Sequence, residues 1–330
     1  MKICTNCVLP ETFPGIKFNE EGVCNHCISF KGQEKLAEQK EKYKAKFERL
    51  FEEHRNNGDY DCLMCYSGGK DSTYTLDILK TEYKARILAV TVDNGFVSER
   101  ATQNIRNVME SLGIDHYLIK PRFDILKRIF TACSSENLYS PKTLERASTI
   151  CTSCMGFVKF ITLRLAIEKR IPFITYGWSP GQAPIASSVF KTNSSMIKSM
   201  QEAIKAPMSS IVGNEINPYF LEERHFDESE KFPYNISPLA FLDYSEEKIY
   251  EKISELGWKA PEDTDANSTN CLLNSYANVL HKSQFGYHPY AFEIANLVRE
   301  GVMTREDGLQ KLNQIEDPQL VTTIKSRLGL

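Results

Sequence analysis

A glycine-rich turn carries the residues best suited to bind phosphate. Residues 66–73 read Tyr-Ser-Gly-Gly-Lys-Asp-Ser-Thr, after an apolar run and before a helical pattern. Paired glycines let the backbone turn sharply and present bare N–H groups to an anion, and the following helix adds the positive end of its dipole. Hydroxyl donors and the mobile charge of the lysine add to this. We therefore predict a phosphate cradle formed by Ser67, Gly68, Gly69, Lys70, Asp71, Ser72 and Thr73.

This turn is not a Walker A loop, which requires glycine at position 64 and serine or threonine at position 71, because the chain has Met64 and Asp71 there. It resembles the Ser-Gly-Gly-x-Asp-Ser loop of the PP-loop ATP pyrophosphatases, among them GMP synthetase, asparagine synthetase, argininosuccinate synthetase and the tRNA thiolases. The resemblance implies that ATP is cleaved between its α and β phosphates, giving an adenylylated substrate and pyrophosphate. An ordinary strand-to-helix turn rich in glycine and serine is the alternative.

Four cysteines near the N-terminus have the spacing of a structural zinc site. Two Cys-x-x-Cys pairs are separated by sixteen residues that include several prolines and glycines. A segment this small cannot bury a core, so a metal would hold it folded, and four protein ligands would leave no open position for chemistry. Four unrelated thiols are the alternative. The predicted Zn²⁺ ligands are Cys4, Cys7, Cys24 and Cys27.

A second cysteine set, Cys151, Cys154 and Cys271, is split across the chain, with the first two just before an expected helix. Their places resemble those in tRNA 2-thiocytidine-forming PP-loop enzymes, where such cysteines bind an iron–sulfur cluster beside the nucleotide. Three thiolates with an open fourth position would equally hold a second Zn²⁺. Buried, inert thiols are the alternative. Cys62 and Cys65 lie in an expected strand and point to opposite faces, so they cannot chelate together.

The elements that position these residues alternate between strands and helices. The first apolar run precedes the glycine turn. Four more apolar runs follow it along the chain, at 86–93, 116–119, 172–177 and 235–239, with helical patterns between them. The alternation predicts an α/β fold with a doubly wound parallel sheet of about five strands, whose carboxyl ends meet ligands.

Two of these strand ends are expected beside Ser67. They are Asp93, after the second strand, and Gly177, after the fourth. In PP-loop enzymes these ends frame the adenosine half of ATP, and the resemblance implies the same use here. A carboxylate that merely holds a turn is the alternative for Asp93.

The chain divides into four parts. We expect a zinc-ribbon-like segment at 1–30, a linking helix at 31–58, an ATP-binding domain at 59–245 and a helical C-terminal region at 246–330. An insertion at 178–236 interrupts the ATP-binding domain and could be a substrate lid or an oligomer contact.

The composition of the 330 residues is that of a soluble protein. The formal net charge of -3 gives no overall attraction to nucleic acid, and no apolar run is long enough to span a membrane. Ten cysteines without a signal peptide indicate a reducing cytoplasm. We therefore expect a cytoplasmic protein with no nucleic-acid partner, which could form a homo-oligomer.

Taken end to end, the chain looks like the N-acetyl sugar amidotransferases. The shared segments are the opening Cys-x-x-Cys-Val-Leu-Pro-Glu-Thr, the Cys-Asn-His-Cys pair, the phosphate loop and the closing Leu-Val-Arg-Glu-Gly-x-Met-Thr-Arg-Glu-Asp-Gly. These proteins convert an acetamido group on a bacterial surface-polysaccharide sugar, as in lipopolysaccharide O-antigen, or on a nonulosonate, into an acetamidino group. The resemblance implies catalytic roles for Lys70 at the departing pyrophosphate and for Asp71 at Mg²⁺ or the phosphates.

Such a reaction needs neutral ammonia, and the chain shows no glutaminase, since Lys2 rather than cysteine follows Met1. We therefore expect a separate glutaminase subunit and an acetamido-sugar substrate. The first rival is a PP-loop tRNA thiolase, favoured by the second cysteine set and opposed by the acidic charge balance. The second rival is a non-enzymatic scaffold, which would bind ATP without releasing AMP.

Overall fold

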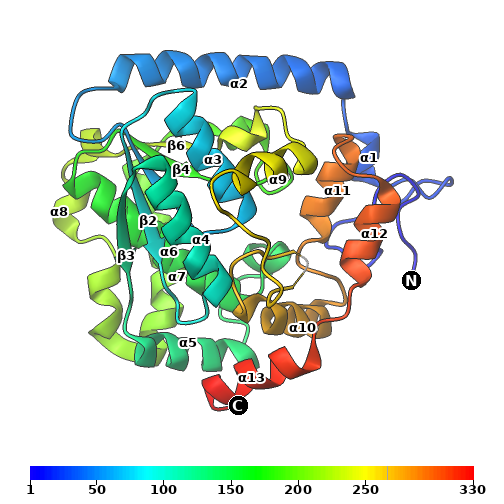
Figure 1. The fold of residues 1–330 in the computed structure, drawn as a ribbon. Coiled ribbons are helices and arrows are strands. Elements are labelled where there is room, and N and C mark those ends of the chain that lie inside the picture. Colours follow the sequence, from blue (N-terminus) through cyan, green and yellow to red (C-terminus); the bar gives the residue numbers. More distant parts are fainter. Residues whose placement is uncertain (266) are drawn as a thin grey trace.

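A six-stranded sheet forms the centre of the computed structural model, which describes residues 1–265 and 267–330 (Figure 1). The strand order is β3-β2-β1-β4-β6-β5, and all neighbours are parallel except the edge pair β5 and β6. The described strands are β1 (Cys62–Cys65), β2 (Ile87–Val92), β3 (Asp115–Ile119), β4 (Phe173–Tyr176), β5 (Val189–Lys191) and β6 (Tyr234–Ile236).

Helices cover both faces of the sheet, as a doubly wound fold requires. One face packs against α2 (Gln33–His54), α3 (Lys70–Thr81), α4 (Glu99–Leu112) and α9 (Glu246–Ser254). The other packs against α5 (Phe123–Ser135), α6 (Thr149–Glu168) and α7 (Ser194–Val212). Alternate residues of β1 enter the two cores, with Met64 in the first and Leu63 in the second. The predicted α/β class and parallel winding are confirmed.

The remaining helices belong largely to the chain's two ends. They are α1 (Asn25–Ile28), α8 (Glu223–Phe226), α10 (Leu273–Phe285), α11 (Ala291–Arg299), α12 (Arg305–Asn313) and α13 (Pro318–Leu328). Short 3₁₀ turns are η1 (Thr143–Glu145), η2 (Ile185–Ser187), η3 (Gly213–Tyr219), η4 (Ser229–Lys231) and η5 (Pro238–Ala240). The predicted linking helix is α2, which runs along one side of the molecule in Figure 1.

Two expectations need correction. The sheet has a sixth strand, β5, which pairs antiparallel with β6 and lies inside the insertion expected at 178–236. The rest of that insertion includes α7, which packs against α5 and α6 and so thickens a helical layer of the fold. In addition, α6 begins at Thr149 and not at about residue 155, because the Ser148 side chain accepts from the N–H of Cys151 and caps the helix.

One helix in the described part of the chain, α6, is long and apolar enough to cross a membrane by length and composition alone. Its apolar residues, among them Phe157, Phe160 and Leu163, belong to the main core. This burial is that of a core helix.

A third, smaller core joins the two ends of the chain. Val8, Leu9 and Phe13 pack with Ala291 and Ile294 of α11. The N-terminal segment is therefore attached to the C-terminal helices, and Figure 1 shows it beside α11 and α12.

Candidate nucleotide site and metal centre

The phosphate loop is the turn between β1 and α3, at the carboxyl edge of the sheet. Gly68 has φ +78, and a Cβ there would lie 2.8 Å from Ile105 and 2.9 Å from the carbonyl oxygen of Ala101 in α4. Only glycine accepts both this conformation and this close approach. Trp258 donates its indole N–H to the carbonyl oxygen of Gly68 at 2.9 Å. The turn is thus fixed from two sides.

The hydroxyls of the loop have different partners. Ser67 Oγ and Ser72 Oγ lie 3.0 Å apart, and the N–H of Gly69 donates to Ser67 Oγ at 3.3 Å. Thr73 is fully buried and donates to the carbonyl oxygen of Gly69 at 2.9 Å. Ser72 Oγ donates to the same carbonyl oxygen at 3.0 Å. The Ser72 and Thr73 hydroxyls therefore both hold the turn, and the Ser67 hydroxyl pairs with that of Ser72.

A residue that the sequence did not single out meets the loop from far along the chain. Thr269 Oγ1 accepts the backbone N–H of Lys70 at 3.0 Å. This N–H lies at the start of α3, where a helix favours anions, so it could donate to a phosphate oxygen placed where Thr269 Oγ1 now lies. No local signal near Thr269 could have indicated this contact.

Lys70 has a side chain that is only 8% exposed and is surrounded by polar partners. Its Nζ donates to Asp71 Oδ1 at 2.8 Å and to the Tyr244 hydroxyl at 2.6 Å, and it forms an ion pair with Glu246 Oε1 at 3.2 Å. Burial alone would lower the pKa of Lys70, but the two carboxylates outweigh it and hold the pKa above its ordinary value. Lys70 is therefore a fixed positive charge, with Tyr244 and Glu246 as partners that the sequence analysis missed.

The two expected strand ends behave differently. A Cβ on Gly177 would lie 2.3 Å from Ser72 Cα, so the end of β4 packs directly on the first turn of α3. Asp93 Oδ1 accepts the N–H of Gly95 at 2.8 Å, and its other oxygen pairs with Lys120 at 3.0 Å. Gly177 is thus brought against the loop, whereas Asp93 makes the contacts of a turn carboxylate.

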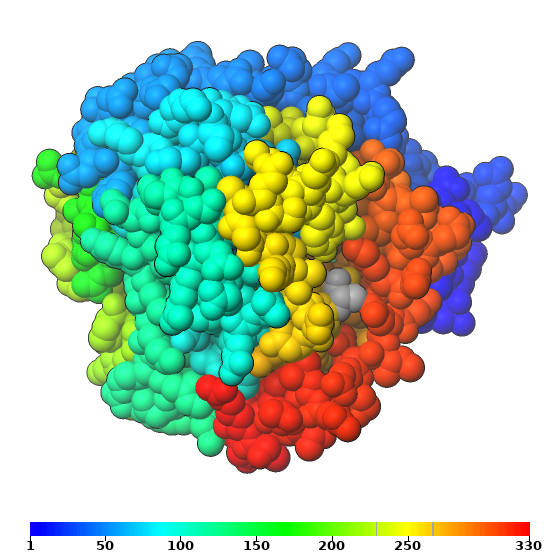
Figure 2. Space-filling model, viewed as in Figure 1, coloured from blue at the N-terminus to red at the C-terminus, as the bar shows by residue number. Residues whose placement is uncertain are grey.

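A cavity of about 790 Å³ lies next to Lys70. Its wall includes Tyr244 and Glu246, the same side chains that contact Lys70, and Glu246 also pairs with Lys311 of α12 at 3.4 Å. Figure 2 shows the yellow α9 region and the orange α12 region together on this face. The volume of this cavity is within the range of small-molecule sites. The full lining is Tyr244, Glu246, Leu297, Val302, Met303, Thr304, Asp307, Gln310, Lys311, Asn313 and Gln314.

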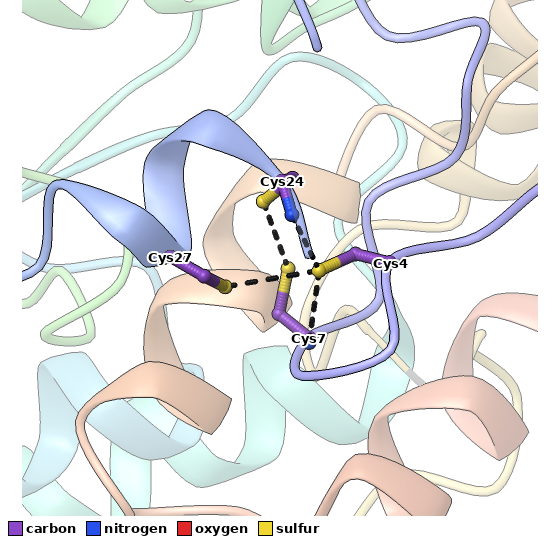
Figure 3. A group of neighbouring side chains, drawn as sticks. All are labelled: Cys4, Cys7, Cys24 and Cys27. Atoms are coloured by element: carbon purple, nitrogen blue, oxygen red, sulfur yellow. Dashed lines mark hydrogen bonds between the residues drawn. The ribbon is translucent and has the colours of Figure 1, made fainter. Parts of the chain in front are cut away.

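The four N-terminal cysteines converge, and their sulfur atoms all lie within 4.8 Å of one another (Figure 3). Sγ–Sγ distances are 3.8 Å for Cys4 and Cys27 and 3.7 Å for Cys7 and Cys24. A tetrahedral site with Zn–S bonds of about 2.3 Å has ligand sulfurs about 3.8 Å apart. The residues therefore fit Zn²⁺, and Arg299 Nη1, 3.4 Å from Cys7 Sγ, would offset part of the thiolate charge.

The second cysteine set contacts two amides, with Cys151 Sγ 3.8 Å from Asn274 Oδ1 and the other two sulfurs at Asn94. Asn94 Nδ2 donates to Cys154 Sγ at 3.2 Å and to Cys271 Sγ at 3.6 Å. Burial, with a smaller contribution from the neighbouring Cys271, raises the pKa of Cys151 and of Cys154 to about 12. Within the described residues, the group of cysteines with metal-binding geometry is the N-terminal four, and it does not include these three. Cys271 also follows Thr269 by two residues, so the set adjoins the phosphate loop.

No family model matches the chain. Among curated proteins, it is 25% identical over 329 residues to the uncharacterized protein MJ1599 of Methanocaldococcus jannaschii, an alignment that covers 99% of both chains.

Three solved structures are also similar. The U34-tRNA thiolase NcsA of Methanococcus maripaludis with its 4Fe–4S cluster is 16% identical with a TM-score of 0.39, covering 100% of this chain and 89% of that one. NMN synthetase of Francisella tularensis is 13% identical with a TM-score of 0.39, covering 86% and 98%. A predicted tRNA methyltransferase subunit of Methanocaldococcus jannaschii is 17% identical with a TM-score of 0.33, covering 70% and 91%.

Proposed function

We propose that the protein is an ATP-dependent, AMP-forming enzyme that transfers an adenylyl group to a carbonyl oxygen. The observation that carries this proposal is the glycine turn at the carboxyl edge of the sheet, with the buried, charged Lys70 between it and a cavity. Lys70 and the loop N–H groups would stabilise the charge on departing pyrophosphate. Asp71, which is half-buried beside Lys70, would hold Mg²⁺, and that ion would neutralise phosphate charge.

For the acceptor, we propose the acetamido group of a bacterial surface-glycan sugar. The cavity beside Lys70 offers amide and hydroxyl groups from Thr304, Gln310, Asn313 and Gln314, which suit a ligand rich in hydroxyls. The carboxylates of Glu246 and Asp307 would repel the phosphates of RNA.

Replacing the oxygen of this amide is chemically reasonable once it is adenylylated. An amide oxygen is a poor leaving group, whereas AMP bound to that oxygen is a good one. Ammonia then displaces AMP and leaves an acetamidino group. A separate glutaminase subunit would deliver the ammonia. Zn²⁺ bound by Cys4, Cys7, Cys24 and Cys27 would hold the N-terminal segment in place.

A second candidate, thiolation of a tRNA base, is favoured by one observation. Cys154 and Cys271 share the Asn94 amide, Cys151 lies on the same helix as Cys154, and Cys271 adjoins the phosphate loop. An iron–sulfur cluster or a second zinc held there would deliver or hold sulfur. The first half-reaction would be the same, because a base carbonyl oxygen would be adenylylated and then replaced by sulfur.

One assay separates these candidates. The protein is incubated with ATP, Mg²⁺ and ammonium and a panel of acetamido sugars, or with sulfide and tRNA. We expect AMP and an amidine product, slightly lighter than the sugar because NH replaces oxygen. AMP release that needs tRNA, with steeply salt-dependent tRNA binding, would favour thiolation. Turnover to ADP and orthophosphate with every acceptor would contradict both candidates. The variant Cys151→Ser should spare amidine formation and abolish thiolation.

A further inference from the structure

Helix α11 brings a carboxyl group, Glu293, to the edge of the nucleotide site. Ser179, three residues beyond β4, donates its hydroxyl to Glu293 Oε1 at 2.6 Å. A Cβ on Gly181 would lie 2.3 Å from the carbonyl oxygen of Glu293, so backbone meets backbone there. Asn296 Nδ2 also donates to the carbonyl oxygen of Gly181 at 3.0 Å. The helix is therefore docked firmly on the loop that leaves the sheet beside Gly177.

The carboxyl group of Glu293 is held near the phosphate loop, because its partner Ser179 lies two residues beyond Gly177, where a Cβ would lie 2.3 Å from Ser72 Cα. The charges of Asp71 and Lys70 both act on the pKa of Glu293, and Glu293 in turn raises the pKa of Tyr244. Tyr244 donates to Asp71 Oδ1 at 2.8 Å. Leu297, one turn further along α11, lines the cavity. Glu293 is therefore on the helix that contributes to the cavity wall, and its carboxyl group is held by the segment that follows β4 and packs on the phosphate loop.

The surroundings of Glu293 hold its pKa near neutrality. Burial raises the pKa to about 7; Asp71 raises it too, while hydrogen bonds from Ser179 and Gln182 and the charge of Lys70 lower it. Tyr290, one turn earlier on the same segment, is another titratable group whose pKa the charge of Glu293 raises, and that pKa lies far above its ordinary value. A carboxyl group that titrates near the working pH is suited to exchange protons during catalysis.

The other carboxylates at the site are already engaged. Asp71 accepts hydrogen bonds from Lys70 and Tyr244, both through Oδ1. Glu246 pairs with Lys70 and Lys311, and although burial opposes it, the charges of these lysines lower its pKa. Glu246, held ionised by two lysines, is therefore a weak base, and Asp71 is tied to Lys70 and Tyr244. Of these three carboxylates, Glu293 is the one left for proton transfer.

We propose that Glu293 is the general base of the transfer step, a role that rests on the proposed function. The ammonia nitrogen attacks the imidate carbon, the C–N bond forms, and the C–O bond breaks so that AMP leaves with its electron pair. The Glu293 carboxylate takes one proton from the attacking nitrogen, and a neutral amidine remains. The proton can then pass to solvent and restore the carboxylate.

The test compares Glu293→Gln with the wild type across pH, at a constant concentration of free ammonia. We expect kcat to fall by about 10²–10⁴-fold, the usual contribution of a general base. The rise in wild-type kcat through about pH 7 should disappear, and ATP affinity should not change. The defect should be smaller with hydroxylamine, because its adduct loses a proton more readily. A purely structural defect would affect both nucleophiles equally.

The matched control is Glu300→Gln, since Glu300 lies at the end of the same helix and also has its pKa raised by burial. It should leave kcat and its pH dependence unchanged. A Glu293→Gln variant with wild-type kcat at every pH would overturn the proposal. If Glu293→Gln does not fold, the pH dependence of kcat is measured for Glu293→Asp instead. A rise of kcat at the same pH as in the wild type would overturn the proposal, because another group would then be the one that titrates. Failure of the wild type to release AMP with any acceptor would instead refute the proposed function, and the base with it.

Discussion

At the scale of single residues, the site depends on how a buried lysine keeps its charge. Lys70 is surrounded by Asp71, Glu246 and the Tyr244 hydroxyl, and these partners replace the water that it loses on burial. The carboxylates come from two elements, so the charge of Lys70 also holds α9 against α3. The same side chain thus has a structural role, and in the proposed reaction it would also act at the departing phosphates.

We expect Lys70→Ala to lower the rate of AMP formation by about 10²–10³-fold, the loss seen when one group stabilising a transition state is removed. The free energy of unfolding should also fall, because Asp71 and Glu246 lose their counter-ion. AMP release and urea denaturation measure the two effects. Lys80→Ala is the control, since Lys80 lies on the same helix and makes only a 3.5 Å contact to Gly113. Equal losses in the two variants would show that the position of the charge is irrelevant.

At the scale of elements, the four-cysteine segment braces the helices that border the cavity. Arg305 of α12 donates to the carbonyl oxygens of Cys4 and Cys7, at 2.9 and 3.1 Å. Phe13 stacks on Phe292 of α11 with ring centroids 5.5 Å apart. These two helices supply Glu293 and much of the cavity wall, so the metal centre would act on the acceptor side of the site from a distance.

Metal removal by a chelator should therefore loosen α11 and α12 before the sheet. Amide hydrogen exchange should speed up across residues 291–313, while β1 and α3 keep their protection. The KM for the acceptor should rise and the affinity for ATP should stay constant. Restoring Zn²⁺ should reverse both changes. Exchange that rises equally in β1 would mean that the metal supports the whole fold and has no special link to these helices.

At the scale of the whole molecule, α10 links the main core to the smaller core at the chain's two ends. Leu273 and Tyr276 pack into the main core, while His281 contacts Tyr287, which belongs to the smaller one. Burial lowers the pKa of His281 to about 4 and that of His288, nearby in the chain, to about 3. Both imidazoles are thus neutral in the folded protein.

This burial predicts acid sensitivity with a definite sign. Below about pH 6.5 the unfolded chain protonates these histidines and the folded chain does not, so stability falls as the pH drops from about 6.5 towards 4. Each histidine adds up to about 1.4 kcal/mol per pH unit in that window. Urea denaturation between pH 4 and 8 measures the slope, and His281→Phe should flatten it. An equally steep slope in that variant would assign the acid sensitivity to other groups.

Much of the architecture was predictable from local patterns. The apolar run of β2 and the glycine turn before α3 are local signals of this kind. Together with similar runs they indicated that strands alternate with helices and that the sheet is parallel. The three-residue strand β5 was missed, because so short a segment carries no clear periodicity and forms a strand only by pairing with the free edge of β6. The start of α6 was missed because the Ser148 cap gives a weaker signal than the apolar pattern that follows it.

By itself, the sequence determined the phosphate turn and the four-cysteine set, because both are built from neighbours in the chain whose spacing fixes their geometry. Only the tertiary structure decided what surrounds them. Thr269, Tyr244 and Glu246 reach the loop from segments more than a hundred residues away. Asp93 Oδ1 turned out to accept a hydrogen bond within its own turn. Contacts over such separations follow from how helices pack on the sheet, and no local pattern encodes that packing.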